Sequence, residues 1–220
     1  MNISIPHIIH EQHFWLSAQR SIYWEEQKTM IVSATHFGKT GHFRKSGIAV
    51  PQQVYKEDLQ RFFSLATDLK PERILVVGDF FHSTDNEEHN LFLRWKNDFN
   101  SLQITLIKGN HDILGNTWYE NAGIQLIEDF YEIGQFRFQH DPAENDFLVK
   151  ENTFVFSGHV HPGIQMRGIG KQSLRFPCFY FTQNQCILPA FSKFSGLAIV
   201  KPKKQDQVYA IANDNIIKLA

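Results

Sequence analysis

The sequence predicts an α/β fold in which two packed β-sheets carry helices on their outer faces. In the first half, short apolar runs alternate with stretches of helical periodicity, whereas from Gly123 onward the pattern is mostly β. A chain that passes from alternating strands and helices to a series of strands is expected to pack its sheets together, with the helices outside.

The 220 residues suffice for one domain, or at most two small ones, with a sizeable core. No internal repeat, low-complexity segment or linker-like composition divides the chain, so we expect a single domain over residues 1–220. The net charge of −1 excludes a broadly cationic surface, and any affinity for polyanions must come from local clusters.

Neither a membrane span nor an export signal is indicated. No stretch approaches the roughly 18 apolar residues that a span requires, and residues 1–10 lack the apolar core of a signal peptide. We therefore expect a cytoplasmic protein with no membrane partner. Cys178 and Cys186 lack metal-ligand spacing, so we expect reduced thiols, with a strand-paired disulfide as the alternative.

Four apolar runs predict buried strands, and two stretches of helical periodicity predict helices. The four strands are expected over residues 30–32, 74–77, 104–107 and 154–156, and the helices over 55–69 and 91–99. In the β-rich part of the chain, further strands are predicted over 124–127, 135–139, 174–181, 186–191, 197–200 and 208–212. Strand ends are where α/β proteins place their sites, because loops there vary on a rigid frame.

Each of the four predicted buried strands runs into a polar turn. The turns are Ala34-Thr35-His36, Gly78-Asp79, Gly109-Asn110-His111-Asp112 and Gly158-His159-Val160-His161, and His140 follows the strand over 135–139. Imidazoles, carboxylates and an amide oxygen from several elements suit a di-metal site. One carboxylate must bridge the two cations because they repel, and Asp79 is the natural bridge. Each turn alone is a common surface feature, but in this order they predict a metal centre.

This series of motifs resembles that of the calcineurin-like metallophosphoesterase superfamily. The resemblance implies a four-layer αββα sandwich of two mixed β-sheets flanked by helices, with two divalent metals at the strand ends. It implies that Asp79 bridges both metals, that His36 and His161 bind the first, and that Asn110, His140 and His159 bind the second. His111 would steady the phosphate and protonate the leaving oxygen, and Asp112 would orient His111.

Longer segments resemble one subfamily, the ligase-associated DNA damage response endonucleases (PdeM-like). They are His36–Lys39, His42–Pro51, Gly78–Ser83 and Leu188–Gly196. The resemblance implies a phosphodiesterase or endonuclease acting on DNA in repair, with DNA ligase, helicase or nuclease partners.

One position departs from the superfamily pattern. The first motif is Asp-x-His, and here it is Ala34-Thr35-His36, in a register fixed by His36 and Gly38-Lys39. A carboxylate ligand of the first metal is therefore missing, and carboxylate charge strongly stabilises a divalent cation. We hypothesise a weakened or vacant first site beside a competent second one, with one metal tightly bound. Mn²⁺ suits the mixed ligand set, and Fe or Zn also fits.

A basic loop follows the first motif. Lys39, Arg44 and Lys45 are predicted to contact a phosphodiester substrate, with an ordinary solvated loop as the alternative. The predicted reaction is a direct displacement at phosphorus that needs no covalent intermediate. Two other functions stay open, namely a small-molecule phosphoesterase for nucleotides or nucleotide-linked lipids, and a catalytically impaired binding module in a DNA-repair assembly.

Overall fold

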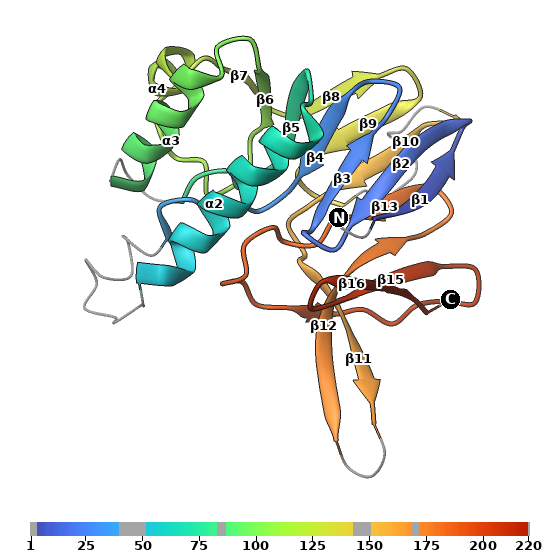
Figure 1. Ribbon diagram of the computed structural model, residues 1–220. Helices are drawn as coiled ribbons and strands as arrows, with labels where there is room; N and C mark the ends of the chain where they lie inside the picture. The colour runs from blue at the N-terminus through green and yellow to red at the C-terminus, as the bar shows by residue number, and fades with distance from the viewer. Residues whose placement is uncertain (1–3, 40–51, 83–86, 143–150, 169–171, 220) are drawn as a thin grey trace.

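The computed structural model of the chain describes residues 4–39, 52–82, 87–142, 151–168 and 172–219 (Figure 1). Two β-sheets face one another, and helices α2, α3 and α4 lie on one side of the pair. The described residues therefore have the α/β architecture of two mixed sheets that the sequence predicts.

Among the described residues, the first sheet has seven strands in the order β1-β2-β3-β4-β5-β6-β7. Neighbours from β1 to β4 are antiparallel and those from β4 to β7 are parallel, so β4, β5 and β6 end at the same edge. The strands are β1 (Ser4–Ile9), β2 (Gln12–Ser17), β3 (Ser21–Trp24), β4 (Thr29–Val32), β5 (Arg73–Val77), β6 (Gln103–Ile107) and β7 (Ile124–Ile127). The predicted strands β4 to β7 are confirmed, whereas β1 to β3 were not predicted.

The second sheet has nine described strands, in the order β14-β11-β12-β13-β10-β9-β8, with β15 paired to β12 and β16 to β15. They are β8 (Phe130–Ile133), β9 (Phe136–Gln139), β10 (Phe154–Ser157), β11 (Pro162–Arg167), β12 (Ser173–Phe181), β13 (Gln185–Ile187), β14 (Ala198–Ile199), β15 (Gln207–Ala212) and β16 (Asn215–Lys218). The prediction of a strand over 186–191 is wrong beyond Ile187, because the following residues form a loop whose backbone bonds to Ser157, to Ser33 and to the Arg20 side chain.

Alternate residues of the central strands serve two cores. In β5, Leu75 and Val77 face the core between the sheets, whereas Ile74 and Val76 face the core beneath the helices. The helices are α2 (Gln52–Leu69), α3 (Glu87–Asp98) and α4 (Asn116–Asn121), and their apolar side chains pack on the first sheet. The two predicted helices are thus confirmed. Of the layers expected for a four-layer sandwich, the described residues supply both sheets and the helical layer over the first.

The ends of the two sheets meet where the site-bearing loops begin. Ser33, just after β4, donates its hydroxyl to the Val77 carbonyl at 2.7 Å. Gly158, just after β10, packs so closely here that a Cβ would lie 2.0 Å from the Ser33 hydroxyl oxygen. Loops from both sheets therefore converge at one edge of the sandwich.

The described residues also bear on membrane spans and on the two cysteines. No helix among them is long and apolar enough to cross a membrane. Cys178 and Cys186 are both free and buried in this structure.

Candidate metal centre

Asp79 lies between two groups of ligand atoms. Its side chain is 3% exposed, with Oδ2 4.0 Å from His36 Nε2 and Oδ1 3.8 Å from His140 Nε2. The two carboxylate oxygens thus face different sets of side chains, which is the arrangement a bridging carboxylate needs.

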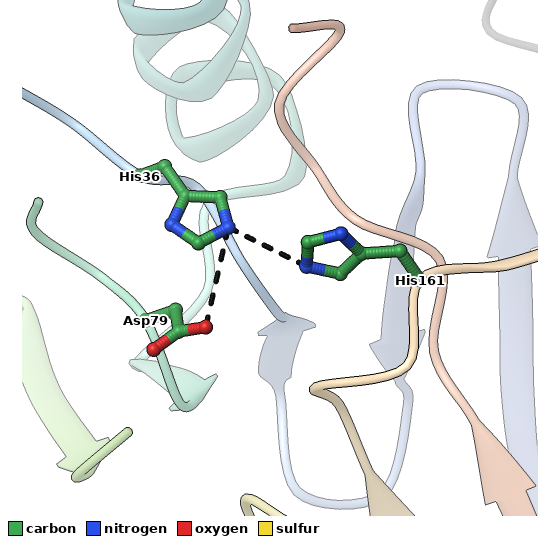
Figure 2. Close-up of side chains that lie close together, drawn as sticks. All are labelled: His36, Asp79 and His161. Carbon is green, nitrogen blue, oxygen red and sulfur yellow. Dashed lines mark hydrogen bonds and ion pairs between the residues drawn. The ribbon is translucent and has the colours of Figure 1, made fainter. Parts of the chain in front are cut away.

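We define the first half-site as His36, Asp79 and His161, whose side chains point toward one another (Figure 2). It is the more enclosed of the two half-sites. Its ligand atoms lie within 4.8 Å of one another, and the two imidazole Nε2 atoms are 3.4 Å apart. His161 hydrogen-bonds the Gly196 backbone, which helps to fix its ring. His36 and Asp79 are buried and His161 is half-buried.

The second half-site comprises Asp79 Oδ1, Asn110, His140 and His159. His140 Nε2 lies 2.9 Å from Asn110 Oδ1 and 3.0 Å from His159 Nδ1. His140 is buried, whereas Asn110 and His159 are exposed. A carboxylate that the sequence analysis did not single out, that of Asp141, lies 3.6 Å from His159 Nδ1 and adds negative charge at the rim.

The donor set fits divalent cations. Burial lowers the pKa of His36 to about 2 and that of His161 to about 4, so both imidazoles are neutral at neutral pH with a lone pair available. Imidazole nitrogen and carboxylate oxygen atoms converge in each half-site, and the second half-site adds the amide oxygen of Asn110. Such atoms attract a cation rather than one another. The six predicted ligands are thus brought together in two groups that share Asp79.

The backbone around this centre is unusual. Ala34 and four predicted ligands, namely His36, Asp79, His159 and His161, have φ between 49° and 61°. Left-handed conformations cost non-glycine residues free energy and persist where the surrounding structure enforces them. Two glycines allow close contact, because a Cβ on Gly78 would lie 1.8 Å from His140 Nδ1 and one on Gly109 would lie 2.3 Å from Asp79 Oδ1.

His111 lies next to the first half-site. Its backbone N–H donates to Asp79 Oδ1 at 3.0 Å, and its ring centroid is 5.3 Å from that of His36. The His82 ring packs on that of His111 with centroids 4.4 Å apart, a contact that the sequence did not reveal. The rings of His36, His82 and His111 thus form one cluster at the first half-site.

Asp112 is buried, and burial raises the pKa of its carboxyl to about 7. Its two oxygens accept hydrogen bonds from the backbone N–H groups of Phe81 and Gly109, each at 2.9 Å. The side chain therefore joins the loop that carries Asp79 to the loop that carries Asn110 and His111.

At the position of the missing carboxylate, Ala34 is fully buried and offers no ligand atom. Its N–H donates to the Gly78 carbonyl at 3.0 Å, and its carbonyl accepts from the Ser192 N–H at 3.1 Å. The backbone of the first motif is therefore held in place beside His36 and Asp79.

Of the three predicted substrate contacts, Lys39 lies in the described part of the chain. It is half-buried beside the first half-site, and its charge contributes to the lowered pKa values of His36 and His161. Arg44 and Lys45 lie outside the described residues.

The calcineurin-like phosphoesterase family matches residues 28–177, which include every ligand of both half-sites. The chain belongs to this family. The structure of the nuclease MPE from Pseudomonas putida is similar, with a TM-score of 0.82 and 26% sequence identity over 99% of this chain and 100% of that one. The phosphoesterase Yfce of E. coli matches with a TM-score of 0.45 and 14% identity, over 87% of this chain and 98% of that one. No curated protein matches the chain significantly.

Family membership and the paired half-sites identify this chain as a metal-dependent phosphoric ester hydrolase. The similarity of this chain to the Pseudomonas putida nuclease extends over the full length of both chains. It is consistent with the resemblance to DNA damage response endonucleases.

Proposed function

We propose that this chain hydrolyses phosphodiester bonds of DNA, as an endonuclease acting in repair. The observation that carries the proposal is the placement of Asp79 between two ligand groups in a fold that matches a nuclease over its whole length. Cytoplasmic location and ligase, helicase or nuclease partners belong to the same proposal.

The chain's own residues bind and orient the phosphodiester. Divalent metals, which the two half-sites would hold, would lower the pKa of water and neutralise charge on the phosphate. A ring nitrogen of His111 donates a proton to the leaving oxygen. The N–H of His111 holds Asp79 Oδ1, and Asp112 fixes both loops through the amides of Phe81 and Gly109, so His111 and Asp79 keep their relative positions. We assign Asp112 this positioning role.

We also propose that the first half-site binds its metal weakly, so that one cation per chain is tightly held. Ala34 supplies no oxygen, which leaves Asp79 Oδ2 as the sole carboxylate oxygen of the described first group. A dication must lose water to enter this buried site, and the half-site then lacks the negative charge that would offset the free-energy cost of dehydration. Mn²⁺ is the cation we expect, with Fe and Zn as alternatives.

The substrate class is tested by comparing cleavage of single-stranded DNA with cleavage of a small chromogenic diester, both in Mn²⁺. We expect cleavage of both, with a higher kcat/KM for DNA, and loss of both on His140→Ala substitution. Cleavage restricted to small diesters would favour a nucleotide or nucleotide-lipid phosphoesterase. If the chain is inert in Mn²⁺ yet binds DNA or a repair protein, the binding-module alternative is correct.

A further inference from the structure

The loop of residues 188–196 is bonded both to the first motif and to a predicted ligand of the first half-site. The Ser192 N–H donates to the Ala34 carbonyl at 3.1 Å. Four residues farther along, the Gly196 backbone hydrogen-bonds the His161 side chain. A shift of this loop would therefore move both the first motif and the ring of His161.

An ion pair on helix α2 holds the middle of this loop. Asp58 accepts from the Ser192 hydroxyl at 2.9 Å and from the Lys193 N–H at 3.0 Å. Arg61, one turn farther along the helix, is paired with Asp58 at 2.9 Å and donates to the Phe191 carbonyl. Three consecutive loop residues are thus bonded to a single ion pair.

A third charge, that of Arg20 in the turn after β2, binds the same loop. Arg20 donates to the Ser192 carbonyl at 2.8 Å and to the Ala190 carbonyl at 3.3 Å. The side chains of Asp58 and Arg61 are only 4% and 9% exposed. Removing charges from water costs free energy that an ion pair repays only in part, so added stability explains this cluster poorly. A single fixed position of the loop accounts for it better.

We propose that Asp58 is a positioning residue for the first half-site. It acts through Ser192 and the loop, whose backbone fixes the ring of His161 relative to His36. Groups that orient a metal ligand commonly change metal affinity about 10- to 100-fold when they are removed. The inference concerns metal binding alone, so it holds whether the substrate is DNA or a small diester.

Mn²⁺ affinity in the Ala34→Asp variant, for which we expect two tightly bound ions, tests this role. The ion of the first half-site is identified as the one that the additional substitution His161→Ala removes. Adding Asp58→Asn instead should weaken binding of that ion about tenfold or more and leave the ion of the second half-site unchanged. Adding Ser192→Ala, which removes a hydroxyl but no charge, should weaken binding of the same ion to a smaller extent.

Asp206→Asn is the matched control. Asp206 is as buried as Asp58, each being 3% exposed. It likewise accepts from a hydroxyl, that of Tyr180 at 2.6 Å, and from a backbone N–H, that of Lys203 at 2.7 Å. These partners lie on β12 and just before β15 rather than in the loop over residues 188–196, so both Mn²⁺ affinities should equal those of Ala34→Asp.

Two results would overturn the proposal. One is that Asp58→Asn and Ser192→Ala leave the ion of the first half-site unchanged or weaken both ions equally. If thermal unfolding shows that Asp58→Asn does not fold, Ser192→Ala alone decides. The other is that Ala34→Asp binds a single ion, because no first half-site would then exist to be positioned. Neither readout depends on cleavage, so failure of the proposed action on DNA would leave both measurements interpretable.

Discussion

The two half-sites share Asp79 but differ in enclosure and in their ligands. In the first, His36 and Asp79 have side chains only 2% and 3% exposed, and the motif carboxylate is replaced by the methyl group of Ala34. In the second, His159 has a side chain 47% exposed, yet all four predicted donors are present and Asp141 lies nearby.

From this difference we infer that burial alone does not make a metal site. A buried half-site removes more water from the cation and therefore needs more ligand charge in return. The described first half-site offers one oxygen of the shared Asp79 carboxylate and two neutral imidazoles. We therefore expect the more exposed half-site to hold its cation more tightly than the more enclosed one.

Loss of the shared ligand should have the largest effect. Asp79→Ala removes an oxygen from both half-sites, so we expect kcat/KM for a chromogenic diester to fall by about 1000-fold or more. Activity assays in saturating Mn²⁺ would measure this, with thermal unfolding to verify that the variant is folded. A loss under tenfold would show that Asp79 does not join the two half-sites.

A substitution that collides with a ligand of the second half-site should come next. The Cβ in Gly78→Ala would collide with His140, and φ at this residue is +75°, so we expect His140 to shift and activity to fall by about 100-fold. Gly115→Ala is the matched control, because nothing lies within 4 Å of its Cβ position. Equal activity of the two variants would contradict the close contact between Gly78 and His140.

Two histidines of the Gly158-His159-Val160-His161 segment can be substituted as a matched pair, with a smaller expected effect on metal affinity. His159 and His161 have similar φ values of 61° and 51° but serve different half-sites. We expect His159→Ala to weaken the affinity for the tightly bound Mn²⁺ by about tenfold more than His161→Ala does. Calorimetric titration of both variants would show it, and a greater loss in His161→Ala would reverse the order of the half-sites.

The sequence could predict which candidate ligands lie together because the signal is local. Each predicted ligand follows a short apolar run, and the carboxyl ends of β4, β5 and β6 share an edge because these strands are parallel. The role of Gly78 and Gly109 in close backbone contact could likewise be anticipated from their places beside Asp79 and Asn110.

The loop over residues 188–196, which bonds to Ala34 and His161, could not be predicted in the same way. Its fixation depends on an ion pair on helix α2, more than 100 residues before the loop in sequence, and on hydrogen bonds that leave no periodic signal. The expected strand over 186–191 ended at Ile187 for this reason. Nor does sequence report that Ala34 has a φ of 50°, a conformation in which Asp and Asn are enriched.

The most direct test of the central claim is the number of Mn²⁺ ions bound per chain, measured by titration of the metal-free protein and of Ala34→Asp. The account predicts one tight Mn²⁺ in the wild type and two in Ala34→Asp, because Asp suits the left-handed backbone at this position and restores the missing charge. Ala34→Asn, of similar shape but uncharged, should bind the second ion more weakly than Ala34→Asp. Two equally tight ions in the wild type would contradict the account.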